Sequence, residues 1–189
     1  GAKALIIALP EPSNTTLKLN GTFTDGISFA KTDVTAPDAL DGLRVTATDE
    51  SNQPVFNTAV AGTTAVSITG LDHVTVDHLT VTGGPLGIYV AGSSTTYATD
   101  ANIHHNTISG ISDENSAIGI EALYVKKSSV HHNTIRDVAM SFTDLGSYTY
   151  AYGLYLAYSD ELVGHNNTVT AFGVTDVFTA AGSHATYLY

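Results

Sequence analysis

Histidine recurs at one position of a repeated segment, and imidazole is a side chain that can bind metals or change its charge near neutral pH. The residues concerned are His78, His105, His132 and His165. If they stack in register, neutral imidazoles would offer ligands to a divalent transition metal. Alternatively, low pH would charge the column and strain it by like-charge repulsion. A stacked aromatic ladder with a purely structural role is the third explanation, and we favour it over a metal site.

Tyrosine occupies a second repeated position. Tyr89, Tyr124, Tyr155 and Tyr187 are expected to point outward from short strands. Phenol rings with a hydroxyl group often contact sugar rings and partner surfaces, so these four residues are predicted to bind carbohydrate. A cross-strand aromatic ladder that protects the sheet explains the same pattern equally well.

An internal repeat must position these residues. The histidine segments begin at Val76, Ile103, Val130 and Val163, which lie 27, 27 and 33 residues apart. The tyrosine segments interleave with them and begin at Gly87, Ala122, Gly153 and Ala185. Both series alternate inward and outward residues, as strands do. One repeat is too small to bury its own apolar face, so successive coils must stack about 4.8 Å apart.

The repeat therefore predicts an all-β fold, a right-handed parallel β-helix of roughly six to seven coils. We expect a single domain over residues 1–189, with less regular opening coils over 1–63 and regular coils over 64–189. A β-sandwich is the rival for the opening part, because Asn20-Gly21, Asp25-Gly26 and Asp41-Gly42 resemble hairpin turns.

Asparagine follows the histidine position and is expected to form a hydrogen-bonded ladder at a tight bend. The ladder would contain Asn106, Asn133 and either Asn166 or Asn167, with Leu79 in the first coil. Longer inserts at 91–100, 110–117 and 137–150 are expected to project from the coils, and the insert side of a solenoid often binds ligands.

The sequence resembles the pectate-lyase-like right-handed parallel β-helix superfamily. The likeness is carried by the run from Val74 to Gly83, by Gly-Ile-Tyr-Val at 87–90 and Gly-Leu-Tyr-Leu at 153–156, and by the His-Asn-Thr-Ile turns. It covers about residues 15–189 and implies the fold. It implies little about function, because the same coils occur in lyases, hydrolases, epimerases, adhesins and phage tailspikes.

Enzymes of this superfamily need groups that are only partly present here. Hydrolases resembling polygalacturonase carry an Asp-Asp pair and a Gly-His-Gly, and the sequence has neither. A lyase needs a basic residue beside an acidic calcium site. Candidates for the base are Lys126, Lys127 and Arg136, and candidates for the cation site are Glu121, Asp144, Asp160 and Glu161. The motif is incomplete, so enzymatic activity stays undecided; no cofactor is evident, and Ca²⁺ would be needed by a lyase.

Composition narrows the range of partners. The net charge of −11 disfavours binding to nucleic acid and anionic membranes. The chain has no cysteine, and no apolar run approaches the roughly 20 residues that span a bilayer. Few lysines and a polar surface favour an extracellular or cell-surface location.

Two functions remain open at this stage. The first is an extracellular domain that binds or processes an extended polysaccharide or cell-surface glycan along a tyrosine-lined face. The second is a structural adhesin or surface filament without catalytic activity, whose copies stack end to end through Leu5–Leu9 and the final strand at 185–189. Truncation from a longer protein would also explain the uncovered final strand, and we slightly favour this explanation over end-to-end stacking.

Overall fold

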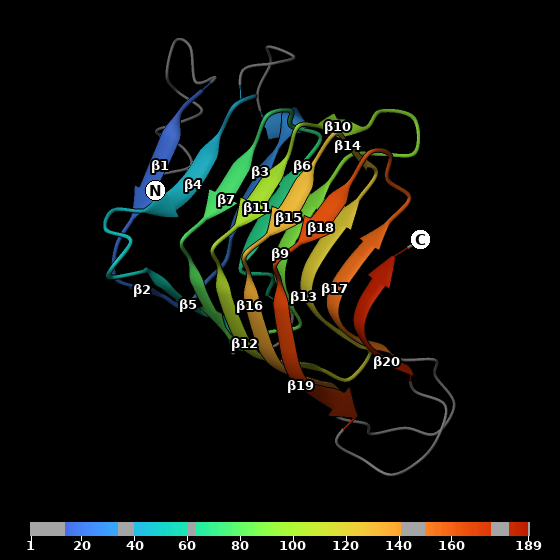
Figure 1. Ribbon diagram of the computed structural model, residues 1–189. Helices are drawn as coiled ribbons and strands as arrows, with labels where there is room; N and C mark the ends of the chain where they lie inside the picture. Colours follow the sequence, from blue (N-terminus) through green and yellow to red (C-terminus); the bar gives the residue numbers. More distant parts are fainter. Residues whose placement is uncertain (1–13, 34–39, 60–62, 141–149, 175–181, 189) are drawn as a thin grey trace.

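The chain folds as a parallel β-helix, and its described residues form six coils (Figure 1). The computed structural model describes residues 14–33, 40–59, 63–140, 150–174 and 182–188. Each coil contributes one strand to each of three sheets, and each sheet contains six strands. The six coils agree with the number expected from the repeat.

The sheets are named A, B and C in the order in which the chain enters them. Sheet A contains β1 (Thr16–Leu19), β4 (Arg44–Ala47), β7 (Thr75–Asp77), β11 (Asn102–His104), β15 (Ser129–His131) and β18 (Val163–His165). Sheet B contains β2 (Thr22–Phe23), β5 (Val55–Asn57), β8 (Thr80–Thr82), β12 (Thr107–Asp113), β16 (Thr134–Met140) and β19 (Thr168–Val174). Sheet C contains β3 (Ile27–Ala30), β6 (Val66–Thr69), β9 (Leu86–Ala91), β13 (Ser116–Leu123), β17 (Tyr150–Ala157) and β20 (Gly182–Leu188). Two short strands, β10 (Ala98–Thr99) and β14 (Val125–Lys126), form a separate pair, and η1 (Lys31–Asp33) is a short 3₁₀ helix.

The opening coils follow the same plan as the later ones. Strands β1, β2 and β3 pair in parallel with β4, β5 and β6, so the dipeptides that resemble hairpin turns do not join antiparallel strands. Gly21 and Gly42 instead have φ angles of +90° and +77°, which glycine adopts without a steric penalty. These glycines turn the chain between strands, and the β-sandwich alternative is wrong.

Stacked aliphatic side chains fill the interior of the coils. In sheet A, Val45, Val76, Ile103 and Val130 are register partners and are all at most 1% exposed. Burial of one such side chain stabilises the fold by roughly 1.5–3 kcal/mol. Because no coil can bury its inward residues without the next, this column couples the coils to one another.

The asparagine ladder lies at the corner between sheets A and B. The Asn106 side-chain amide donates to Asn133 Oδ1 at 3.0 Å, and the Asn133 amide donates to Asn167 Oδ1 at 3.0 Å. Both asparagines are 1% exposed, and their side chains also bond backbone groups of the coil below. The predicted ladder is confirmed, with Asn167 rather than Asn166 as its last member.

The last coil is shifted by one residue from the alignment made on the sequence. Gly164 pairs with Val130, whereas Val163 pairs with Ser129 and is 55% exposed. The repeat that begins at Val130 is therefore 34 residues long. The alignment of Val163 with Val130 was wrong, because it assigned an outward residue to the core. Gly164 leaves the inward position without a side chain, beside a hollow of about 250 Å³ lined by Leu154 and Leu156.

Candidate functional site

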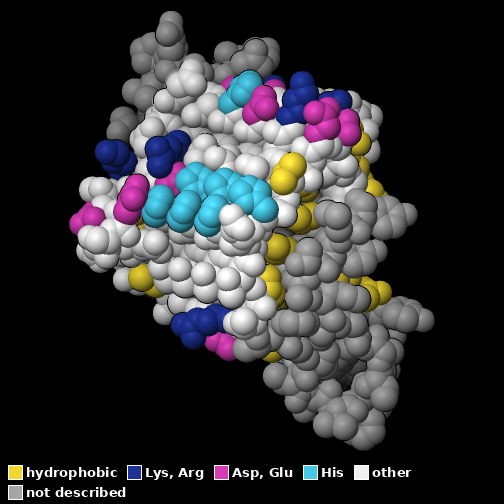
Figure 2. Space-filling model, in the orientation of Figure 1, with side chains coloured by type: hydrophobic (Ala, Val, Ile, Leu, Met, Phe, Trp, Pro, Cys, Tyr) yellow, Lys and Arg dark blue, Asp and Glu magenta, His cyan; other side chains and the backbone are white. Residues whose placement is uncertain are grey.

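Six histidines form two neighbouring columns on the outer face of the corner between sheets A and B. The strand-end column contains Asp77, His104, His131 and His165, which are register partners at the ends of four strands. The corner column contains His78, His105, His132 and Asn166, each with a left-handed φ of 53° or 54°. His and Asn tolerate this conformation better than most side chains. We call the six histidines the double histidine ladder, and Figure 2 shows them as one continuous band.

The rings stack along each column and meet edge to face between columns. In the corner column, the ring centroids of His105 lie 5.1 Å from those of His78 and 5.0 Å from those of His132, with planes within 7° of parallel. In the strand-end column, His131 lies 5.0 Å from His104 and 4.9 Å from His165. The predicted stacking of His78, His105 and His132 is confirmed. The placement of His165 in their column was wrong, for the same one-residue shift that affects Gly164.

The sequence pattern did not indicate His104, His131 and Asp77 as site residues. The doublets His104-His105 and His131-His132 were visible in the sequence, but only their second members were aligned as a site. A strand ends at the first member of each doublet and the chain turns at the second, so both rings emerge on the same outer corner. The doublet itself was the signal that could have revealed the second column.

Asp77 ends the strand-end column as a buried carboxylate. Arg44 Nε donates to its Oδ2 at 2.7 Å and Arg44 Nη2 to its Oδ1 at 3.0 Å, and Thr46 Oγ1 and His78 Nδ1 also bond it. Burial raises the pKa of Asp77, but the hydrogen bonds from Arg44, His78 and Thr46 outweigh burial and the pKa is lowered. The carboxylate therefore stays ionised and accepts hydrogen bonds at neutral pH.

Two imidazoles of the strand-end column, those of His104 and His131, have lowered pKa values. Burial lowers the pKa of His104 to about 4, with Asp77 opposing the shift and the neighbouring imidazoles reinforcing it. Burial also lowers the pKa of His131, and His165, His132 and His105 contribute to the same direction. Charging either ring at neutral pH would place a cation next to other rings that can carry the same charge.

Tyrosines gather on the outer face of sheet C. Tyr89, Glu121 and Tyr155 are register partners on β9, β13 and β17, and Tyr187 pairs with Tyr155 through the backbone of β20. Along β17, the Tyr152 ring stacks on Tyr155 at 4.9 Å and on Tyr150 at 5.6 Å. We call Tyr89, Glu121, Tyr150, Tyr152 and Tyr155 the tyrosine face. Tyr150 is its most exposed member at 38%, and the side chain of Tyr187 lies outside the described part of the chain.

Glu121, not Tyr124, occupies the middle of the outward column. The prediction that Tyr124 shares a column with Tyr89 and Tyr155 was wrong, because Gly119 rather than Ala122 is the equivalent of Gly87. Tyr124 instead stacks on Tyr158 at 5.2 Å and meets the edge of Tyr97. Burial raises the pKa of the Glu121 carboxyl to about 6. Burial also raises the pKa of the Tyr89 phenol, and the negative charge of Glu121 contributes to this second shift.

Of the candidate lyase residues, Lys126, Asp160 and Glu161 lie together. Lys126 Nζ pairs with Asp160 Oδ2 at 2.8 Å and lies 3.9 Å from Glu161 Oε1. The hydrogen bond to Asp160 raises the pKa of Lys126, which is the wrong direction for a general base. Lys127 is exposed in a left-handed turn, and Arg136 lies 3.5 Å from Asp137. Asp144 lies outside the described residues, so its role as a cation ligand stays a prediction.

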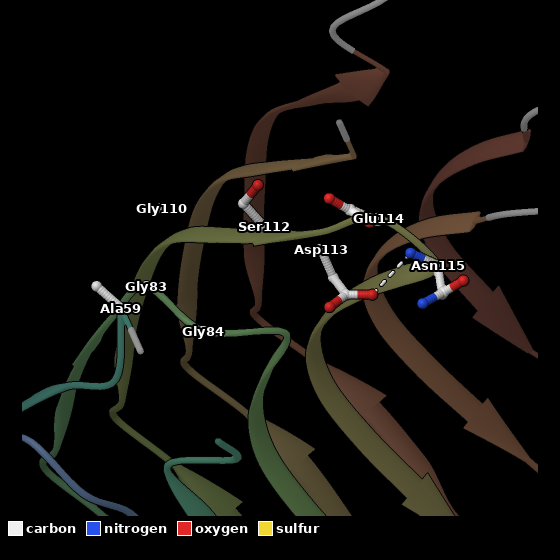
Figure 3. Close-up of a pocket in the computed structure, with 8 residues that line it drawn as sticks. All are labelled: Ala59, Gly83, Gly84, Gly110, Ser112, Asp113, Glu114 and Asn115. Atoms are coloured by element: carbon white, nitrogen blue, oxygen red, sulfur yellow. Dashed lines mark hydrogen bonds between the residues drawn. The ribbon is translucent and has the colours of Figure 1, made fainter. Parts of the chain in front are cut away.

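A polar hollow of about 460 Å³ lies where sheet B meets sheet C (Figure 3). Gly83, Gly84 and Gly110 line one side of it, and Asp113, Glu114 and Asn115 line the other. Asp113 Oδ1 accepts hydrogen bonds from the backbone N–H groups of Asn115 at 2.7 Å and Ser116 at 3.1 Å. This carboxylate holds the turn between β12 and β13. The expectation of an insert over 110–117 was wrong, because residues 110–113 belong to β12 and residues 116–117 to β13, with only Glu114 and Asn115 between the two strands.

Comparison with known proteins decides the family. The family model described as a right-handed β-helix region matches residues 41–187, which is most of the chain. The chain belongs to the right-handed β-helix family. The hand of the coils and the predicted fold are thereby confirmed together with the parallel sheets. No curated protein and no solved structure matches the chain.

Membership of the right-handed β-helix family does not by itself indicate a function. The function must therefore be inferred from the side chains of this chain. Within residues 14–33, 40–59, 63–140 and 150–170, no three His, Asp or Glu side chains are arranged to hold a metal ion. The alternative that His78, His105, His132 and His165 bind a metal, over which a structural ladder was favoured, therefore gains no support. In the described part of the β-helix, no helix is long and apolar enough to cross a membrane.

Proposed function

We propose that this β-helix binds an extended, uncharged polysaccharide across the tyrosine face of sheet C, outside the cell or at its surface. The observation that carries the proposal is the register of Tyr89, Glu121 and Tyr155, which places two phenols on either side of one carboxyl group. Adjacent coils are about 4.8 Å apart, so the two phenols lie about 10 Å apart along the helix axis. A polymer chain running along this axis would contact all three residues.

Aromatic rings and hydroxyl groups on this face suit a sugar ligand. A sugar ring has apolar C–H faces and polar edges, and a phenol offers both an apolar ring and a hydrogen-bonding hydroxyl. Tyr150 and Tyr155 add aromatic surface along β17, and the buried Tyr152 ring stacks on both and supports them from below. Rings that pack against one another lose little conformational entropy on binding.

Glu121 favours uncharged glycans over polyuronates. It is the charged member of a column whose other members are Ser28, Ser67, Tyr89, Tyr155 and Tyr187, and the chain carries a net charge of −11. An acidic polymer would be repelled by both charges. With a pKa near 6, the carboxyl accepts hydrogen bonds from sugar hydroxyls at pH 7 and donates one when protonated.

The proposal is one of binding and leaves catalysis aside. Glycoside hydrolysis commonly uses two carboxyl groups that flank the bond, and Glu121 is the member of the tyrosine face that carries one. The paired Lys126 does not supply the base that a lyase needs.

A glycan array tests the proposal directly. The parent protein should be retained on neutral glucans, mannans or xylans and not on polygalacturonate. Tyr155→Ala should weaken retention roughly two- to twelvefold, since one aromatic contact is worth about 0.5–1.5 kcal/mol. Tyr158→Ala is the matched control, because Tyr158 is 46% exposed and lies in the separate stack with Tyr124.

Glu121→Gln separates hydrogen bonding from charge. The amide keeps the shape and hydrogen-bonding capacity of the carboxyl, so binding to neutral glycans should persist while repulsion of polyuronates weakens. Absence of binding to every neutral glycan, or equal losses in Tyr155→Ala and Tyr158→Ala, would refute the proposal.

A further inference from the structure

Three hydrogen bonds join the two columns of the double histidine ladder, one in each of three successive coils. In every case Nδ1 of the corner residue lies against the strand-end residue before it. The distances are 2.7 Å for His78 to Asp77 Oδ1, 2.9 Å for His105 to His104 Nδ1, and 2.8 Å for His132 to His131 Nδ1. The repeated geometry indicates that the same residue donates in each coil.

The pair formed by His131 and His132 has only one arrangement of protons when both rings are neutral. Asn102 Oδ1 can only accept, so His131 donates from Nε2 across 3.0 Å. A neutral imidazole has one N–H, so His131 Nδ1 is an acceptor and His132 Nδ1 is the donor to it. His132 Nε2 then accepts a hydrogen bond from the Asn166 side-chain amide at 3.2 Å. Every ring nitrogen of this pair is satisfied without an added proton.

The same direction of donation fits the other two coils. Asp77 can only accept from His78, because its carboxylate is ionised beside Arg44. His104 Nε2 lies 4.0 Å from Asp77 Oδ2, which is too far for a hydrogen bond, but the nearby carboxylate favours the tautomer with the proton on Nε2, in which Nδ1 accepts from His105. The strand-end column thus supplies an acceptor in each coil, first as a carboxylate and then as two imidazoles.

An added proton on an acceptor imidazole removes its contact. Protonated His131 would carry N–H on both nitrogens, so its Nδ1–H would face the Nδ1–H of His132 across 2.8 Å. His132 could avoid this contact only by moving its proton to Nε2, which would then lose the hydrogen bond that it accepts from the Asn166 amide. At His104 an added proton would face the Nδ1–H of His105 across 2.9 Å in the tautomer that His105 has before protonation. Protonation would also put positive charge into columns of rings stacked about 5 Å apart.

We propose that the double histidine ladder is an acid-sensitive clasp, which holds the corner between sheets A and B while His104 and His131 are neutral and loosens when they take up protons. The clasp lies directly outside the ladder of Asn106, Asn133 and Asn167, which turns the chain at the same corner.

Other charged groups near the clasp do not remove this effect. Asp77 is neutralised by Arg44, and Glu50 Oε2 approaches the Nε2 atom of His78 at 3.5 Å, at one end of the ladder. Lys18 precedes Thr46 and Asp77 in the register of the strand-end column. His165 adds a third ring next to His131. Only Asp77 and Glu50 among these groups favour an imidazolium, and both lie at the His78 end.

Stability should fall in a defined pH range. A histidine has a pKa near 6.5 in an unfolded chain, and burial lowers the pKa of folded His104 to about 4. Between these values the unfolded chain binds more protons, so stability is full above about pH 6.5 and is lost as the pH falls toward 4. The lowered pKa of His131 adds to the loss in the same direction.

Thermal unfolding of the parent chain and one double variant tests the clasp. The melting temperature of the parent should fall by roughly 2–5 °C between pH 7.5 and 5.0, because the loss at His104 and His131 exceeds the opposing gain from Glu121, whose raised pKa lets the folded chain take up a proton in this range. In His104→Asn plus His131→Asn, Asn Oδ1 replaces Nδ1 as an acceptor that does not titrate, so at least half of this fall should disappear. His73→Asn is the matched control, because His73 is also left-handed but its exposed ring pairs with Asp100 outside the ladder.

Nitrogen NMR of the imidazoles tests the proton arrangement even if the double variant fails to fold. At pH 7.5, His131 should be protonated on Nε2 and His132 on Nδ1, and the signal that couples their Nδ1 atoms should be lost only well below pH 6.5, because the pKa of folded His131 is lowered. Nε2 protonation of both rings at pH 7.5 would overturn the proposal. A double variant whose melting temperature falls with pH as steeply as that of the parent would overturn it as well.

Discussion

At the residue scale, side-chain hydrogen bonds at the corner between sheets A and B link each coil to the next. Asn133 donates to Asn167 Oδ1 and to the Ile103 carbonyl, while its own Oδ1 accepts from Asn106. Asparagine suits this position because it carries both a donor and an acceptor at the end of a short side chain. Leu79 ends the ladder, since its backbone N–H bonds Asn106 Oδ1 and its side chain joins the core.

Replacement of one ladder member should be strongly destabilising. Asn133→Ala leaves buried partners on Asn106, Asn167 and the backbone without a hydrogen bond, and each such group costs about 1–3 kcal/mol. We expect a loss of roughly 2–4 kcal/mol in the free energy of unfolding, measured by urea denaturation. Asn57→Ala, at an exposed position on β5, should change it by less than about 0.5 kcal/mol. Similar effects of the two substitutions would contradict the structural role of the ladder.

At the element scale, a column of glycines fixes how the strands of sheet C are aligned. Gly87 and Gly119 precede the register partners Ile88 and Ile120, and Gly153 precedes their partner Leu154. A Cβ atom on Gly119 would lie 2.6 Å from the Gly153 carbonyl oxygen and 2.7 Å from Ile135 Cγ2. The chains of adjacent coils approach so closely here that a side chain does not fit.

The fold could be predicted from the sequence because spacing and alternation repeat even where residue types change. The one-residue errors arose where chemical likeness competed with geometry. The alignment of Tyr124 with Tyr89 was wrong because Gly119-Ile120 is the pair that aligns with Gly87-Ile88. The tyrosine face and the second histidine column depend on such alignments, so only part of the candidate site could be found before the backbone was known.

Two glycine-to-alanine substitutions should therefore have opposite effects. Gly119→Ala should destabilise the chain by about 1–3 kcal/mol, because the added methyl group clashes with backbone and core. Gly164→Ala should be neutral or stabilise it by up to about 1 kcal/mol, since the new Cβ would lie 3.4 Å from Leu156 Cδ1 in ordinary contact. Denaturant midpoints of the two variants measure the difference. A stable Gly119→Ala protein would show that the coils can shift at this column.

At the scale of the whole molecule, a β-helix is nearly one-dimensional. Each coil pairs only with the coil before and the coil after it, as the order of strands in sheets A, B and C shows (Figure 1). Stability is then close to a sum over coils and the interfaces between them. A local defect should loosen its own coil and its neighbours and leave distant coils intact, provided that local openings occur below the free energy of global unfolding.

Hydrogen exchange can test this property with a substitution in the middle of the β-helix. Asn133 lies between β15 and β16 in the fifth coil, and its partners Asn106 and Asn167 lie in the coils on either side. In Asn133→Ala, amide exchange should accelerate in β11, β12, β15, β16 and β18, because the ladder that joins these coils is broken there. Exchange in β1, β2 and β4 should change little, since two or more intact coil interfaces separate them from the substitution. Equal acceleration in all six coils would instead mean that the described β-helix opens as one cooperative unit, and the stability of each site would then be that of the whole.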